Sequence, residues 1–147
     1  MADLNPLLRD VEAWARKKGI LSTTPGPAEN DVVILNTPFG QGQLDIAVTV
    51  GHGLCVMSVP NFDDIPEEEA LEYPILKAIA AVNYLPGLFR FGFDPTTREL
   101  RLRVAFPVKD RVSDDSLEFA LASLEVGSDL YDKAIEQLGE RLGESAR

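Results

Sequence analysis

The sequence predicts a single α+β domain built around a β-hairpin from Leu88 to Phe106. The chain has 147 residues and is 45% hydrophobic, which suits one domain with a substantial core. Apolar and polar residues alternate along both arms of the proposed hairpin, as in strands with one buried face. Segments near both ends instead carry apolar residues at helical spacing. The predicted order of elements is α-β-β-β-α-β-β-α, within one domain over 1–147.

The chain is strongly acidic, with a formal net charge of −10. This charge repels phosphate backbones and anionic lipid surfaces, so we expect no nucleic-acid partner and no membrane partner. No apolar stretch approaches the length of a membrane span, and the segment from Met1 to Arg9 lacks the features of a signal peptide. Cys55 is the one cysteine, so folding needs no oxidising compartment. We expect a cytoplasmic protein.

The first helix is predicted over residues 6–18. Asn5 suits the N-cap, Pro6 the first helical position, and Gly19 the position that ends a helix. The apolar positions are Leu7, Val11, Trp14 and Ala15. A polar linker rich in Pro and Gly is expected over 22–30.

Three strands are expected next. Residues 32–35 form a short β-branched run typical of an edge strand, and 37–42 form a turn. Residues 44–50 alternate between apolar and polar, with Leu44, Ile46 and Val48 on one face. Residues 54–59 are apolar on both faces, which indicates a central strand.

The middle helix is expected after an acidic loop over 61–69. Its apolar stripe is Ile75, Leu76, Ile79, Ala80 and Val82. Pro74 is expected in its first turn, because a proline further inside breaks the hydrogen-bond ladder. Pro86 and Gly87 end the helix.

The hairpin has one apolar face and one face that carries arginine. Phe89, Phe91, Phe93, Leu102 and Phe106 are expected in the core. Arg90, Arg101 and Arg103 lie on the opposite face, and 94–99 form the turn.

The last helix is predicted to start at a capping pair of Asp115 and Glu118. Its apolar stripe is Leu117, Ala120, Leu121, Leu124, Leu130, Tyr131, Ile135, Leu138 and Leu142. Gly127 costs about 1 kcal/mol of local helix stability relative to Ala, and it permits a bend or close packing. A flexible C-terminus is expected over 143–147.

The sequence offers no catalytic residue, no cofactor site and no metal site. His52 lies between two glycines in a hairpin turn, where we expect it to be exposed and without an orienting carboxylate. Cys55 is expected to be a buried strand residue. Gly40 and Gly42 lack the third glycine and the following helix of a nucleotide-binding loop.

An acidic cluster spans residues 63–72. Its members are Asp63, Asp64, Glu67, Glu68, Glu69 and Glu72. We interpret it as favourable charge at a helix N-terminus. The alternative is a metal-binding or hydrolytic site, although the spacing of an EF-hand loop is missing.

The most informative polar residues are Arg90, Arg101 and Arg103. In one interpretation they pair with Asp45 or Glu99 and cover the sheet with their stems. In the other they form a docking strip for an acidic or carbonyl-rich segment of a partner protein.

Four short motifs resemble the helix-to-hairpin core of the YbjN domain family. They are Asn83-Tyr84, Gly87-Leu88-Phe89, Phe93-Asp94 and Glu99-Leu100-Arg101. The similarity in element order covers residues 32–138. The segment 24–27 and Pro74 depart from the family pattern.

This resemblance implies the type III secretion chaperone-like fold, a twisted antiparallel sheet with helices packed on it. Proteins of that fold are often dimeric, and the secretion chaperones bind extended segments of client proteins. Members of the YbjN family are described as regulators, including regulators of sensory transduction, without an agreed activity. We therefore expect a non-enzymatic protein-binding module, chaperone-like or a regulatory adaptor, that forms a homodimer.

Overall fold

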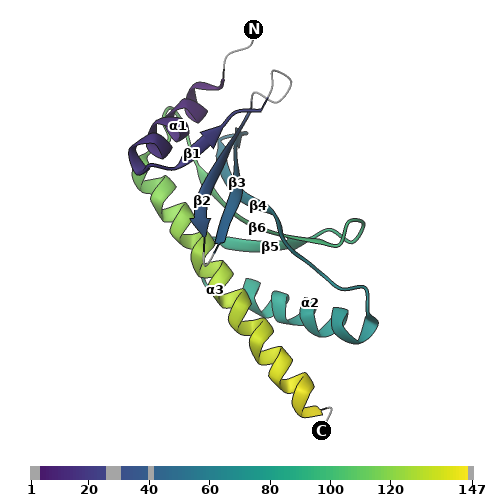
Figure 1. Cartoon of the computed structure of the whole chain (residues 1–147). Coiled ribbons are helices and arrows are strands. Elements are labelled where there is room, and N and C mark those ends of the chain that lie inside the picture. Colours follow the sequence, from purple (N-terminus) through teal and green to yellow (C-terminus); the bar gives the residue numbers. More distant parts are fainter. Residues whose placement is uncertain (1–3, 26–30, 40–41, 146–147) are drawn as a thin grey trace.

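A computed structural model of the chain describes residues 4–25, 31–39 and 42–145, apart from the side chains of residues 144 and 145 (Figure 1). Three helices accompany six strands in these ranges, and the predicted α+β class is confirmed. The order of elements agrees with the prediction except for one additional strand between the first helix and the three expected strands. The elements are α1 (Pro6–Lys18), β1 (Leu21–Thr23), β2 (Val32–Phe39), β3 (Gly42–Gly51), β4 (Leu54–Asp64), α2 (Glu69–Tyr84), β5 (Phe89–Phe93), β6 (Glu99–Pro107) and α3 (Asp114–Ser145).

The strands form one antiparallel sheet in the order β1-β2-β3-β4-β6-β5. Residues on alternate positions point to the two faces, so the register divides the sheet into an inner and an outer face. The inner face carries the strand residues of the core, among them Val33, Leu35, Ile46, Val48, Met57, Leu102, Val104, Phe89 and Phe91. The predicted hairpin core is confirmed, with Phe93 partly buried at its margin.

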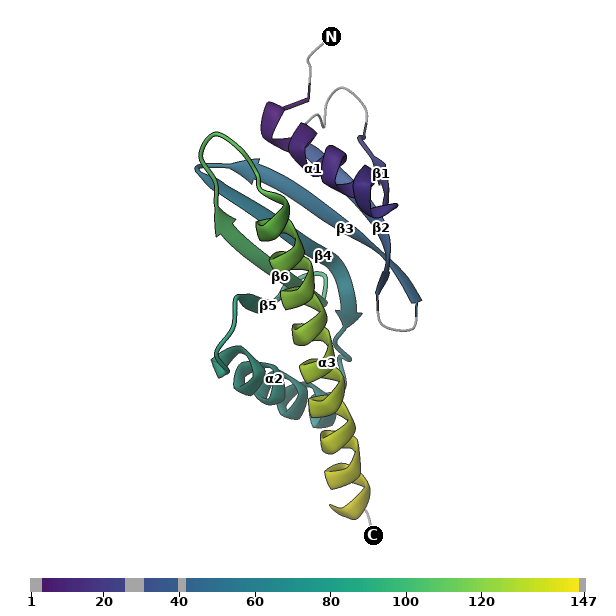
Figure 2. The ribbon, with the colours of Figure 1, turned by 90° about the vertical axis from the view of Figure 1, so that its left-hand side faces the viewer.

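Helices α1 and α3 lie side by side across the inner face (Figure 2). Leu8, Val11 and Trp14 of α1 are fully or almost fully buried there. Leu117 and Leu124 of α3 are fully buried as well. At about 25 cal/mol per Å² of apolar surface removed from water, this layer is the main stabilising contribution of the fold.

Gly127 lets α3 approach the sheet closely. A Cβ atom at this position would lie 2.9 Å from Cγ of Phe89 and 3.0 Å from Cδ1 of Leu102. The close-packing alternative predicted for this glycine is therefore confirmed. The N-cap of α3 is Ser113, whose hydroxyl accepts from the amide of Ser116 at 3.2 Å. The predicted Asp115 cap was wrong, because the helix begins one residue before it.

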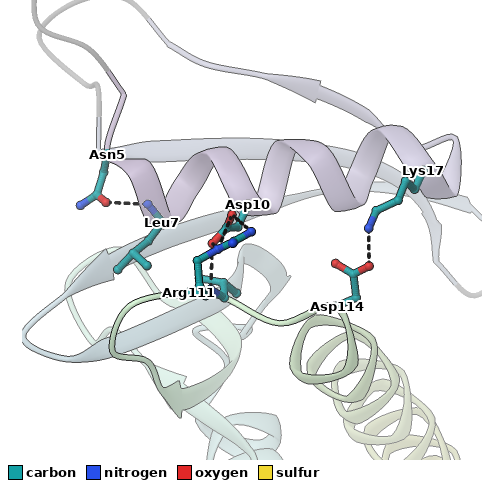
Figure 3. Close-up of polar contacts among 7 residues, drawn as sticks. Asn5, Leu7, Asp10, Lys17, Arg111 and Asp114 are labelled. Carbon is teal, nitrogen blue, oxygen red and sulfur yellow. Dashed lines mark hydrogen bonds and ion pairs between the residues drawn. The ribbon is translucent and has the colours of Figure 1, made fainter.

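The N-terminus of α1 follows the prediction: the Asn5 side chain accepts from the amide of Leu7, and Gly19 ends the helix at φ 72°. Polar contacts then hold α1 to the segment before α3 (Figure 3). The Asp10 carboxylate accepts from Nε and a terminal nitrogen of Arg111, at 3.0 Å each, and also from the amide of Val112. Lys17 forms an ion pair with Asp114.

The N-terminal part of the sheet differs from expectation. Leu21–Thr23 forms a strand that pairs with β2, so the linker predicted over 22–30 begins later; its residues 26–30 lie outside the described ranges. β2 is thus not the edge strand, and it continues through Pro38 to Phe39 where a turn was expected. Ser22, Thr23 and Pro38 lie in strands although the local sequence predicts a linker and a turn there. Pairing with the neighbouring strands outweighs these local signals.

The middle of the chain holds two further differences. β4 continues to Asp64 through an irregularity between Val59 and Asp63, where a loop was predicted. α2 begins at Glu69, which places Pro74 inside the helix and not in its first turn. The proline lies only five positions after the start, so a single hydrogen bond to the Ala70 carbonyl is lost. β4 is central, as predicted.

Candidate protein-binding surface

The outer face of the sheet carries the three predicted arginines, all of which are exposed. α1 and α3 lie across the opposite face (Figure 2). Arg90 of β5 stands directly opposite Arg103 of β6, and Gly92 stands opposite Arg101. Arg103 in turn faces Ser58 of β4. The sequence placed these arginines on one sheet face, and the structure brings them together in adjacent cross-strand pairs.

A shallow hollow of about 310 Å³ lies among these side chains. Its lining residues are Arg90, Phe91, Gly92, Phe93, Asp94, Glu99, Arg101 and Arg103, which we call the arginine pocket. Gly92 creates the space, because a Cβ atom there would have no neighbour within 4 Å. The pocket is thus open to solvent, and three of its eight lining residues are arginines, beside the acidic residues Asp94 and Glu99.

The arginines have few internal partners. Arg90 donates to the carbonyls of Gly87 at 2.8 Å and Phe89 at 2.7 Å. Arg101 and Arg103 are exposed, and neither makes an ion pair or side-chain hydrogen bond within the described parts of the chain.

The expected alternative partners of the arginines are engaged elsewhere or unpaired. Asp45 accepts from the side-chain amide of Asn36 at 2.9 Å. Glu99 lines the pocket but forms no ion pair with an arginine. The interpretation in which Asp45 or Glu99 pairs with the arginines is therefore not what the structure shows.

The carboxylate of Asp94 serves the hairpin turn. It accepts from the amide of Thr96 at 2.8 Å. Arg98 is the positively charged residue of this turn. It has a positive φ of 64° and forms an ion pair with Glu72 at 2.6 Å. Its guanidinium also lies over the ring of Phe93. Arg98 therefore fixes the turn to the start of α2 and leaves the pocket to the other three arginines.

The free edge of β5 is blocked. The side-chain amide of Asn83 donates to the carbonyl of Phe91 at 2.9 Å and accepts from its amide at 2.7 Å. The Phe89 carbonyl accepts from Arg90. An exposed strand edge is a template for strand addition, and here side chains occupy it. This edge of the sheet is therefore closed to strand addition, while the arginine-bearing face beside it is exposed.

The acidic cluster over 63–72 is dispersed in the structure. Asp63 is exposed, and its carboxylate accepts from the Tyr131 hydroxyl at 2.6 Å. Glu72 forms an ion pair with Arg98. Glu69 and Glu72 lie in the first turn of α2, where their negative charge interacts favourably with the helix dipole. Within the described ranges, no group of three His, Cys, Asp or Glu side chains is arranged to hold a metal ion.

The two other candidate residues are placed as predicted. His52 is an exposed turn residue with φ 52°. Cys55 is fully buried on β4, and burial raises the pKa of its thiol to about 12. A buried thiol with a raised pKa is a poor nucleophile.

Two polar contacts have no counterpart in the sequence patterns. The Asp10–Arg111 pair joins residues that are 101 positions apart, and the Tyr131–Asp63 bond joins residues 68 positions apart. Hydrogen bonding from Arg111 lowers the pKa of Asp10 below its ordinary value. Burial and the bond to Asp63 raise the pKa of Tyr131. Both contacts hold elements together and lie away from the arginine pocket.

No protein-family model matches the chain, and no curated protein matches it in sequence. Among solved structures, the crystal structure of YbjN from E. coli is similar in fold. The TM-score is 0.66 at 14% sequence identity, over 92% of this chain and 96% of that one. YbjN is described there as a candidate transcription regulator. In the described part of the chain, none of the helices has the length and apolar character needed to cross a bilayer.

Proposed function

We propose that this protein, which shares its fold with the YbjN structure, is a non-enzymatic protein-binding module that works as a regulatory or chaperone-like adaptor in the cytoplasm. Its arginine pocket docks an acidic or carbonyl-rich segment of a partner protein. The observation that carries this proposal is the exposed, unpaired state of Arg101 and Arg103 beside Arg90 on an open sheet face.

Charge supports this assignment. Like charges directly opposite each other on a sheet are unfavourable, yet Arg90 and Arg103 form such a pair. A carboxylate between them would remove the repulsion and accept charge-assisted hydrogen bonds, which are about twice as strong as neutral ones. In a chain with net charge −10, these arginines are a local exception that selects an acidic segment.

The shape of the surface supports an extended segment as ligand. The pocket opens onto the outer face, where Ser58, Ala47 and Ile34 continue the row that begins at Arg103. These small and apolar side chains allow a chain to lie flat across the strands. Such an interface combines one or two contacts to arginine with a small apolar area, a composition common in protein interfaces.

The same fold suggests a homodimer. Several large apolar side chains remain exposed: Tyr73 at 71%, Tyr84 at 91%, Phe119 at 60% and Val126 at 50%. Exposed apolar side chains of this size are covered when proteins associate, and two-fold dimers are the most frequent assembly. Size-exclusion chromatography with light scattering is expected to give twice the 16.1 kDa chain mass at micromolar concentration.

The docking proposal is tested by affinity purification from native cells with quantitative mass spectrometry. The wild type is compared with an Arg101→Ala/Arg103→Ala double variant and with Arg16→Ala as a matched control. Arg16 is an exposed arginine in the last turn of α1, away from the outer face. We expect the double variant to lose a specific partner that the control retains. Equal capture by all three proteins would overturn the docking role.

A further inference from the structure

A second hollow lies between α2 and the C-terminal half of α3, with a volume of about 680 Å³. We call it the α2–α3 groove, and its lining residues lie within 73–85 and 130–141. α2 runs beside this half of α3 (Figure 1). The groove shares no lining residue with the arginine pocket, so the two are separate surfaces.

Apolar side chains make up most of the groove. Ala78 and Ala81 of α2 and Ala134 of α3 are small, which leaves room between the two helices. Tyr73 and Leu85, near the two ends of α2, line the groove and are 71% and 41% exposed. Apolar surface of this kind favours a partner that removes it from water. The groove therefore offers an apolar contact area.

The charged residues of the groove are all basic. They are Lys77 of α2 with Lys133 and Arg141 of α3, and all three are exposed. None of them forms an ion pair with another residue of the described ranges. In a chain with net charge −10, a groove lined by basic but no acidic side chains is a local exception. Unpaired cations beside an apolar surface attract carboxylates.

The positions of these cations favour several carboxylates over one. Lys77 stands on the α2 wall, and Lys133 and Arg141 stand on the α3 wall. The last two are eight residues apart, which is about 12 Å along the helix axis. An amphiphile with one anionic headgroup, such as a fatty acid, reaches one of these cations and leaves the others unpaired. An amphipathic helix carries carboxylates on both flanks of its apolar stripe over several turns, so it meets both walls.

We propose that the α2–α3 groove binds an amphipathic helix of a partner protein, whose apolar stripe is flanked on both sides by glutamate or aspartate. The stripe packs on the alanines and Leu85, and the flanking carboxylates accept hydrogen bonds from Lys77, Lys133 and Arg141. This site goes beyond the arginine pocket, which is proposed to dock an extended segment. Because the two surfaces share no residue, a substitution in one leaves the other intact.

The probe is a synthetic helical peptide of about 18 residues, because shorter isolated helices are marginal in water. It carries leucine at positions i, i+3, i+4 and i+7 and glutamate on both flanks of this stripe. One comparison peptide has glutamine in place of every glutamate, and the other has the same composition in an order without an apolar stripe. Fluorescence anisotropy at about 0.15 M salt measures the affinities, since long-range repulsion from the acidic chain is then largely screened.

The first variant of the groove reverses its charge. It is Lys133→Glu/Arg141→Glu, and its matched control is Arg16→Glu/Lys109→Glu, which changes the net charge of the chain equally at positions outside the groove. All four side chains are exposed and none forms an ion pair within the described ranges, so both variants are expected to fold. Circular dichroism and thermal melting check that they do.

The second variant fills the groove. Ala81→Trp places a large side chain in the space between α2 and α3. Ala122→Trp, on the N-terminal half of α3 and outside the groove, is its matched control. Both alanines are exposed, so the new side chains do not enter the core.

Wild type is expected to bind the glutamate peptide at least about tenfold more tightly than either comparison peptide, because charge and apolar stripe act together. Both groove variants are expected to bind it at least about tenfold more weakly than wild type, and both controls to bind like wild type. Arg101→Ala/Arg103→Ala is expected to keep the full affinity, since the arginine pocket is a separate surface.

Four results would overturn the proposal. Equal affinity for the three peptides, or no binding of any, would show that the groove does not select an acidic amphipathic helix. Unchanged affinity in the groove variants, or lost affinity in Arg101→Ala/Arg103→Ala, would place the peptide elsewhere. Binding of laurate in place of the peptide would assign the groove to an amphiphile with one headgroup. A wild-type dimer that the groove variants dissociate in analytical ultracentrifugation would assign the groove to a second copy of the chain.

Discussion

The side chain of Asn83 pairs with the backbone of Phe91 as a neighbouring strand would. Its amide nitrogen and oxygen meet the carbonyl and amide of Phe91 at 2.9 and 2.7 Å. Asn83 comes from the last turn of α2, so this pair ties the helix to the sheet edge and ends pairing there. The edge is closed to strand addition, and the adjacent face with its arginines remains exposed.

Asn83→Ala is expected to lower the free energy of unfolding by about 1–3 kcal/mol, because two hydrogen bonds to a half-buried strand are lost. Urea unfolding followed by circular dichroism measures it. Asn36→Ala is the control: its side chain makes one exposed hydrogen bond to Asp45, and its loss is expected to cost under about 0.5 kcal/mol. If both variants lost the same free energy of unfolding, the hydrogen bonds between Asn83 and Phe91 would contribute no more to stability than one exposed hydrogen bond.

Gly127→Ala is expected to destabilise the protein by about 1–3 kcal/mol, because the new Cβ would press on Phe89 and Leu102. Gly139→Ala on the same helix is the matched control, since a Cβ there would meet nothing within 4 Å. It is expected to stabilise the helix by about 0.5–1 kcal/mol. Thermal unfolding of both variants gives opposite shifts if α3 packs as described.

The Asp10–Arg111 pair predicts a dependence of stability on pH. Hydrogen bonding from Arg111 holds the pKa of Asp10 below its ordinary value of 3.8. The contribution is therefore fully present above pH 3.8 and is lost as pH falls through the lowered pKa. Asp10→Asn is expected to cost more stability at pH 7 than at pH 3 in urea unfolding. A cost independent of pH would mean that the carboxylate charge contributes nothing.

Cys55 is expected to resist thiol reagents in the native protein. Burial raises its pKa to about 12, so at pH 8 the reactive thiolate is almost absent and the sulfur is shielded. Ellman's reagent is expected to react only at the rate of unfolding, and at full speed in urea. Fast labelling of the native protein would contradict the placement of β4 in the sheet centre.

Local sequence patterns correctly predicted the elements whose faces and ends depend on residues close together in the chain. The alternation along 88–106 placed the hairpin faces correctly, and Asn5 with Gly19 bounded α1 correctly. The arginine pocket was predicted in part, because strand alternation placed Arg90, Arg101 and Arg103 on a shared face. The hollow at Gly92 depends on how side chains fill space, which strand alternation does not contain.

Contacts over long chain separations explain the failures. β1 has only three residues, too few to show the alternation of a strand, and it is held in the sheet by pairing with β2. Pro74 lies inside α2, which is held by packing against α3 and β5 rather than by its propensity. The hollow between α2 and α3 is likewise lined by two separate segments, 73–85 and 130–141, so no short window of the sequence displays it.

The most direct test of the central claim is the affinity of a captured partner for the wild type, the Arg101→Ala/Arg103→Ala variant and the Arg16→Ala control. Isothermal titration calorimetry at two salt concentrations measures all three. We expect the double variant to bind at least about tenfold more weakly and with less salt dependence, because charge-assisted contacts are lost. Unchanged affinity in the double variant, or an equal loss in the control, would contradict docking through the arginine pocket.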